Sequence, residues 1–216
     1  HLEAAFDLYI SSQQYAEAAR LVGQQAPILL HQGRSKTLLS WLSQLPQDFF
    51  EKTPWLLYWE GEGKTIQDPL IARAPLERAY ELFVEQHDIL GATLSCCLII
   101  ESFKVLWDNF HLMDPWIDRL ETHIEQLPEE IPAETDVRIL SALLTAYLFR
   151  RPSHPKLHKW QTKAESLIHS TPDPNLRTML AESCFFIRLW KDGLTKVSML
   201  LDNVRPFMDS SSSVST

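Results

Sequence analysis

The sequence predicts an all-α protein, built as a TPR-like α-α superhelix in which antiparallel helical hairpins stack into a solenoid. Glycine is scarce, with six in 216 residues, while alanine, leucine, glutamate and glutamine dominate the periodic segments, and this composition favours helix. Strand signals are absent, because no apolar/polar alternation is sustained and no Asn-Gly or Asp-Gly turn separates two apolar runs. Similar helical segments recur about 34 to 47 residues apart, which is typical of TPR and HEAT repeats.

Pairs of a capping residue and proline mark four predicted helix starts. In each pair the side chain of the first residue can accept a backbone N–H, and proline suits the first helical position. The four pairs are Thr53-Pro54, Asp68-Pro69, Asp114-Pro115 and Asp173-Pro174. Ser35 is a fifth predicted N-cap, and Gly33 is predicted to end the helix before it.

The clearest hairpin joins an aromatic helix that contains Trp55–Trp59 to the amphipathic segment Leu76–Phe83. In the second segment the apolar residues recur at i, i+3, i+4 and i+7, which forms one helical stripe. Its small residue, Ala79, is predicted to lie where two helices come closest, with Phe83 filling the space above.

The later helices alternate between two kinds. Helices of the first kind are apolar on almost every side, and they are the segments Ile89–Trp107, Val137–Phe149 and Leu176–Trp190. Helices of the second kind have one apolar stripe, and they are the segments Ile117–Leu127, Leu157–Leu167 and Val197–Val204. A helix that is apolar all round must be covered on several sides, so the first kind is interpreted as inner helices and the second as outer helices. Inner helices are predicted to begin near Pro54, Ile89, Asp136 and Pro174. The predicted repeat domain covers residues 1–208, in which 1–50 form a possible helical linker, and the serine-rich residues 209–216 are a predicted disordered or linker tail.

Three segments resemble a known family. They are Tyr15–Leu21, Leu38–Pro46 and Pro54–Trp59, and together they look like the helical region of MalT-like signal-transduction ATPases of the STAND class. The resemblance implies a TPR-like superhelix that senses an inducer or binds partners, with a nucleotide-binding domain and an output domain, often a LuxR-type DNA-binding domain, elsewhere in the parent chain. This sequence contains no G-x-x-x-x-G-K-[ST] motif, so the ATPase activity is not carried over.

Composition restricts the partners and the compartment. The formal net charge is −8 and no Lys/Arg cluster is suited to a phosphate backbone, so direct nucleic-acid binding is not expected. Three cysteines, two of them adjacent, do not make a disulfide framework, which favours a reducing, cytoplasmic location. No signal peptide is expected, and the most apolar window, Ala92–Ile100, is too short to span a membrane. Because the chain begins with His1, it is predicted to be an excised piece of a longer protein.

No catalytic, metal or cofactor site is predicted. His154 and His158 have the i, i+4 spacing of metal ligands, but two solvent-facing histidines are the more economical interpretation. Cys96 and Cys97 point to different sides of a helix and are interpreted as core positions. The remaining candidates for a catalytic histidine, His111, His123 and His169, lie near no serine or cysteine in a catalytic context.

The candidate binding site is the concave face that the inner helices would line. Aromatic residues there are core by default or line the groove; those considered are Trp55, Tyr58, Trp59, Trp107, Tyr147, Phe186 and Trp190. Charged residues within apolar helices either face the groove or pair with one another, because burying them unpaired is expensive. Arginines at Arg150, Arg151 and Arg188 would form a basic spot for an anion or carboxylate. The residues assigned to the site are Tyr58, Trp59, Glu62, Glu101, Lys104, Tyr147, Arg150 and Arg188, of which Tyr58 and Tyr147 are the most expected to be core.

The function predicted from these observations is binding without catalysis. The leading hypothesis is an effector-sensing or protein-binding segment of a larger signal-transduction or transcriptional regulatory protein, with a protein or small molecule in the concave groove. A stand-alone TPR-like interaction scaffold is the alternative, and a small helical enzyme is a third class.

Overall fold

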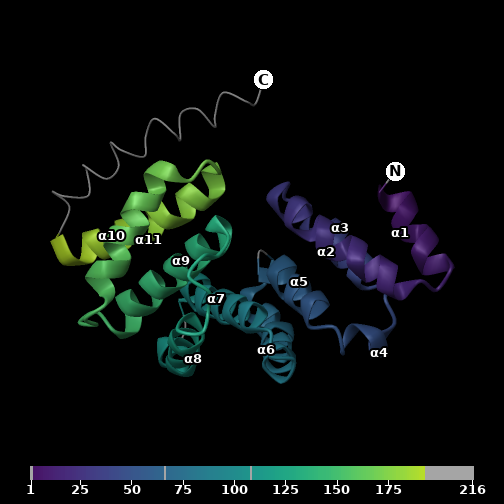
Figure 1. Ribbon diagram of the computed structural model, residues 1–216, viewed down its shortest axis with the longest axis horizontal. Coiled ribbons are helices and arrows are strands. Elements are labelled where there is room, and N and C mark those ends of the chain that lie inside the picture. The colour runs from purple at the N-terminus through teal and green to yellow at the C-terminus, as the bar shows by residue number, and fades with distance from the viewer. Residues whose placement is uncertain (1, 66, 108, 193–216) are drawn as a thin grey trace. The chain divides into compact units, whose positions relative to one another are not determined.

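The computed structural model describes residues 2–65, 67–107 and 109–192, and side chains up to residue 190. Within these ranges the chain forms helices and no strand, which confirms the all-α prediction. Figure 1 shows the helices in chain order. They are α1 (Leu2–Ser11), α2 (Tyr15–His31), α3 (Ser35–Leu42), α4 (Gln47–Phe50), α5 (Pro54–Thr65), α6 (Pro69–Glu85), α7 (Ile89–Leu106), the 3-10 helix η1 (Phe110–Met113), α8 (Asp114–Ile124), α9 (Ala133–Arg150), α10 (Leu157–Ser170) and α11 (Pro174–Asp192).

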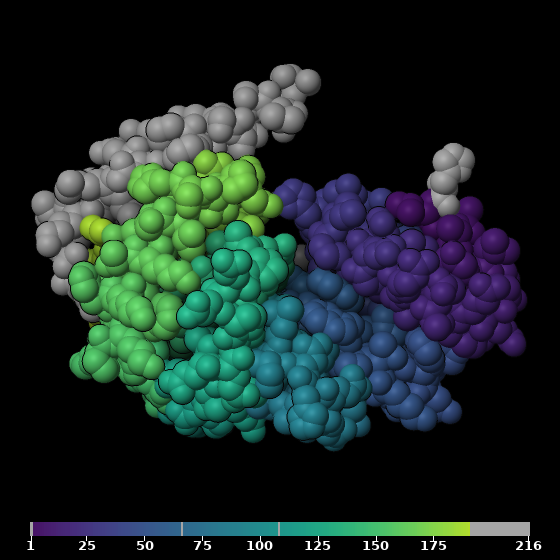
Figure 2. All heavy atoms as spheres, viewed as in Figure 1, coloured from purple at the N-terminus to yellow at the C-terminus, as the bar shows by residue number. Residues whose placement is uncertain are grey.

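The helices divide into two compact units. Unit 1 consists of His1–Asp108 and Arg119–Leu127, and unit 2 consists of Asn109–Asp118 and Pro128–Thr216. Helix α8 therefore contributes its first five residues to unit 2 and its second half to unit 1. Figure 2 shows the heavy atoms of the chain from the same side as Figure 1.

Three tight turns of the same design connect helices in unit 1. In each, the residue after the C-cap has a positive φ: Gln13 (58°) after α1, Gly33 (70°) after α2 and His87 (58°) after α6. The two backbone N–H groups that follow the C-cap donate to carbonyls of the last helical turn, which is the hydrogen-bond pattern of a Schellman motif. The predicted stop at Gly33 is confirmed, and these short connections make the joined helices antiparallel neighbours.

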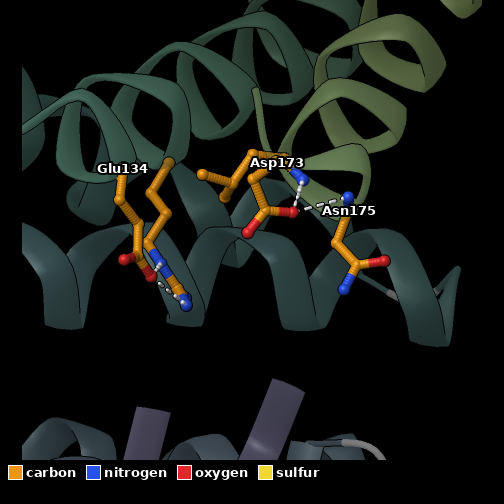
Figure 3. Close-up of polar contacts among 5 residues, drawn as sticks. Glu134, Asp173 and Asn175 are labelled. Atoms are coloured by element: carbon orange, nitrogen blue, oxygen red, sulfur yellow. Dashed lines mark hydrogen bonds and ion pairs between the residues drawn. The ribbon is translucent and has the colours of Figure 1, made fainter. Parts of the chain in front are cut away.

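Two of the predicted side-chain caps are confirmed. The Asp68 carboxylate accepts from the backbone N–H groups of Leu70 and Ile71, at 3.0 and 3.3 Å. At the start of α11 the Asp173 carboxylate accepts from the N–H groups of Asn175 and Leu176, at 2.7 and 3.4 Å (Figure 3).

The other three caps differ from the prediction. Ser35 is the first residue of α3 rather than its cap, and the N-cap residue Arg34 makes no side-chain capping bond. The Thr53 hydroxyl donates to the Phe49 carbonyl, 2.9 Å away. Asp114 lies inside the first turn of α8, where its carboxylate binds an arginine of α9 instead of a backbone N–H. A nearby stronger donor thus overrides the local preference for capping.

From α7 to α10 the burial alternates as predicted, whereas α11, which was predicted to be apolar all round, buries only one face, formed by Leu180, Ala181, Ser183, Cys184 and Ile187. Helices α5, α7, α9 and α11 begin at Pro54, Ile89, Ala133 and Pro174, within three residues of the predicted starts. In α7 every residue from 91 to 100 is buried, and in α9 every residue from 139 to 147. Helices α8 and α10 instead bury single stripes. The stripe of α8 consists of Trp116, Ile117, Leu120 and His123, and that of α10 consists of Leu157, Ala164 and Ile168. The third predicted outer stripe, at Val197–Val204, and the tail 209–216 lie outside the described residues.

Glycines mark close approaches of helices in unit 1. A Cβ added to Gly61 of α5 would collide with the side chain of Leu76 and lie 3.3 Å from the Ala72 carbonyl oxygen of α6. A Cβ on Gly91 of α7 would collide with the ring of Phe83 in α6. Ala79 is fully buried, as predicted, but these two tight contacts lie at the glycines.

Candidate effector-binding residues

The aromatic residues of α5 form a cluster that is mostly core. Tyr58 is 1% exposed, and its ring lies edge-on to those of Trp55 and Trp59, with centroids 5.4 and 4.9 Å apart. Trp55 in turn meets Phe83 of α6 edge-on at 4.9 Å. Tyr58 is thus a packing residue, whereas Trp59 is half-buried and keeps part of its surface accessible.

The charged candidates of unit 1 lie on α5 and α7, two of the predicted inner helices. Glu62 of α5 is half-buried and follows Tyr58 by one helical turn. In α7 the Lys104 ammonium lies 3.0 Å from the Glu101 carboxylate, and their side chains are only 17% and 18% exposed. The sequence left open whether such charged residues face the groove or pair with one another, and Glu101 and Lys104 pair with each other.

Tyr147 of α9 is a core residue of unit 2. It is fully buried, and its ring stacks on that of His154 with centroids 4.3 Å apart. The His154 Nδ1 accepts from the backbone N–H of Lys156, so this imidazole packs at the turn before α10. The interpretation of His154 and His158 as two solvent-facing histidines is therefore wrong for His154, whereas His158 is exposed. No group of three or more His, Cys, Asp or Glu side chains suited to a metal ion occurs among the described residues.

The arginines of the predicted basic spot each bind a carboxylate. Arg150 makes a bidentate contact with Asp114, with Nε–Oδ1 and Nη2–Oδ2 distances of 2.8 and 2.6 Å. This hydrogen-bonded contact lowers the pKa of the Asp114 carboxyl and raises that of the Arg150 guanidinium. Arg151 also binds a carboxylate, through one contact between its Nη2 and Oδ1 of Asp118.

Arg188, the third arginine of the predicted basic spot, also binds a carboxylate. Arg188 of α11 contacts the Glu165 carboxylate of α10 at 2.7 and 2.9 Å, and Glu165 also accepts from the Gln161 amide. An anionic ligand would therefore have to replace a resident carboxylate at each of these arginines.

The eight predicted site residues fall into both units. Unit 1 contains Tyr58, Trp59, Glu62, Glu101 and Lys104, and unit 2 contains Tyr147, Arg150 and Arg188. Within the units the structure brings Tyr58 next to Trp59 and Glu101 next to Lys104.

Two tryptophans outside the predicted site expose more of their surface to solvent than the aromatic residues of that site. Trp107, just after α7, is 66% exposed, and Trp190, near the end of α11, is 79% exposed. Exposed apolar side chains accompany Trp107 at the same end of the antiparallel pair α6 and α7, namely Leu70, Ile71 and Val105. Helical periodicity did not separate these tryptophans from the core aromatics, because both lie at the ends of inner helices, where burial stops.

The buried cysteines are poorly suited to nucleophilic chemistry. Burial raises the pKa values of the Cys96 and Cys184 thiols, which disfavours the nucleophilic thiolate and fits core positions.

One helix of the described part, α7, is long and apolar enough to cross a membrane. Most of this helix is buried inside the protein, as in the core helix of a packed domain.

Comparison with known proteins adds no relative: no family model, no curated protein and no solved structure matches this chain.

Proposed function

We propose that this chain is a non-catalytic, TPR-like segment of a larger cytoplasmic regulatory protein of the MalT-like type, where it senses an effector or binds a protein. The observation that supports the proposal most is the recurrence of inner helices, which begin at Pro54, Ile89, Ala133 and Pro174, about 35 to 45 residues apart. Such repeats stack into extended surfaces that serve for recognition rather than for catalysis.

The placement of charge on the inner helices also supports binding. Lys104, Arg150 and Arg188 each occur in the C-terminal half of an inner helix, where the helix dipole favours a cation. Each is only 17% to 31% exposed and has a carboxylate partner. A ligand with a carboxylate or phosphate group could exchange with those partners. At Arg150 and Arg188, whose partners lie on α8 and α10, such an exchange would couple binding to the packing of the neighbouring helix.

The test is an inducer-response assay on the full-length parent protein. Glu62→Ala, Lys104→Ala and Arg188→Ala are introduced singly, with Glu85→Ala and Lys159→Ala as controls on the outer helices α6 and α10. The expected result is a weakened response for the inner-helix variants, which remain folded by circular dichroism with at most a small loss of thermal stability, and an unchanged response for the controls. If the controls abolish the response and the inner-helix variants do not, the concave-face assignment is wrong.

The exposed Trp107 favours a second candidate function, a stand-alone TPR-like interaction scaffold. Tryptophan is enriched among residues that dominate protein interfaces, and Trp107 lies beside exposed apolar residues. The complete gene separates the two functions: a P-loop domain encoded upstream supports the regulator, whereas a gene without one supports the scaffold.

A further inference from the structure

A buried histidine connects the second half of α8 to α6 within unit 1. The Tyr80 hydroxyl of α6 lies 3.1 Å from the His123 Nε2 of α8, and the two rings have centroids 5.7 Å apart. The Arg119 guanidinium lies over the Tyr80 ring, 5.1 Å from its centroid. His123 itself is buried, with 8% of its surface exposed.

The buried imidazole has one nitrogen with a partner and one without. In the part of the chain that the structure describes, Nδ1 of His123 is buried and makes no hydrogen bond. A neutral imidazole suits this site, because its single N–H can lie on Nε2 and leave only a lone pair at Nδ1. A protonated imidazole has two N–H groups, and one of them would be buried without an acceptor, beside the positive charge of Arg119.

We propose that His123 makes the docking of the second half of α8 on α6 dependent on pH, so that the neutral ring favours docking and the protonated ring opposes it.

The charges around His123 agree with this direction. Burial lowers the pKa of His123, and Arg119 lowers it further. A histidine whose pKa is lowered by folding contributes stability above its usual value of 6.5, and that contribution is lost as the pH falls through the folded pKa. The other groups of the cluster do not produce the same effect. Glu77 of α6 has a pKa raised by burial, so its protonation favours the folded state, and the pKa values of Tyr80 and of Cys96 in α7 are raised and lie at alkaline pH.

Hydrogen exchange on the full 216-residue chain tests the proposal. Peptides that cover residues 119–124 are compared at about pH 7.5 and about pH 5.5, after correction for intrinsic exchange rates. The wild type is expected to lose protection in this segment at the lower pH. His123→Gln, which cannot take up a proton, is expected to show no such loss, and His158→Gln, at an exposed histidine of unit 2, is expected to behave like the wild type.

Two outcomes overturn the proposal. One is a loss of protection at low pH in His123→Gln that equals the loss in the wild type. The other comes from NMR titration of the histidine ring protons in the wild-type chain, which needs no folded His123 variant: a His123 pKa at or above that of His158 shows that protonation does not oppose docking.

Discussion

At the scale of single residues, Gly91 sets how closely α7 approaches α6. The ring of Phe83 occupies the space that a Cβ would need, and Phe83 is itself fully buried against Trp55. Gly91→Ala must therefore displace a ring that has no room to move, and we expect it to lower the free energy of unfolding by about 1–3 kcal/mol. Urea unfolding followed by circular dichroism measures the change.

Gly23 provides the matched control for Gly91. It lies within α2, and a Cβ added there meets nothing within 4 Å. Gly23→Ala should raise the free energy of unfolding by about 0.5–1 kcal/mol, because alanine loses less backbone entropy in a helix. Equal effects of the two substitutions would show that helix propensity, and not the Phe83 contact, decides both.

The contact between Arg150 and Asp114 predicts a dependence on acid. The lowered pKa of Asp114 means that this pair contributes stability above the usual carboxyl value of 3.8, and that the contribution is lost as the pH falls through the folded pKa. Because both side chains are partly exposed, a double-mutant cycle with Arg150→Met and Asp114→Asn should give a coupling of only about 0.5–1 kcal/mol near neutral pH. A coupling that persists undiminished at about pH 2 would contradict the assignment.

Some of these residues were predictable from the sequence and others were not. Asp68 and Asp173 accept from backbone N–H groups only two or three residues further along the chain, so the local sequence pattern was enough to predict these caps. The pairs Arg150–Asp114 and Arg188–Glu165 join residues 36 and 23 positions apart, and the sequence left open whether these arginines face a groove or a carboxylate. The side chains that meet across two helices depend on how those helices pack, which no local pattern specifies.

At the scale of the helical elements, the turn between α6 and α7 holds a non-glycine residue in a left-handed conformation. His87 has φ of 58°, Asp88 follows it, and the Asp88 carboxylate accepts from the Gly91 N–H at 2.9 Å to cap α7. His87→Gly should raise the free energy of unfolding by about 1 kcal/mol, because glycine adopts this φ without steric cost. Thermal and urea unfolding of the variant measure the gain.

Gly33 gives the opposite test in an equivalent turn. Its φ is 70° and a Cβ there would meet open space, so Gly33→Ala changes the backbone preference and little else. It should destabilise the chain by a similar amount, about 1 kcal/mol. If His87→Gly is neutral while Gly33→Ala destabilises, the histidine side chain makes a compensating contact at the turn.

These turns also show how far a pattern predicts an element. Gly33 was predicted as a stop because glycine is the usual residue there, whereas Gln13 and His87 occupy the same position without any glycine to indicate it. The starts of the inner helices were predicted within three residues, since prolines and apolar runs are local signals. The close approach at Gly61 and Gly91 was missed, because a glycine inside a helix signals a partner only when the partner helix is known.

At the scale of the whole molecule, the three cysteines report on the two units separately. Cys96 and Cys97 are buried in unit 1 and Cys184 in unit 2, and burial raises the pKa values of Cys96 and Cys184. Since a buried thiol reacts only when its surroundings open, native-state reaction with an aromatic disulfide reagent measures the free energy of opening. Cys184→Ser leaves reporters in unit 1, and the double variant Cys96→Ser, Cys97→Ser leaves the reporter in unit 2.

We expect the two reporters to give different free energies of opening, because the packing of the chain divides into two compact sets of helices. The difference should narrow as urea is added and both reporters approach global unfolding. Circular dichroism of each variant serves as the control, since a serine in the core must not itself unfold a unit. Identical free energies at every urea concentration would show that the chain opens in one cooperative step, and the two units would then not be independent in stability.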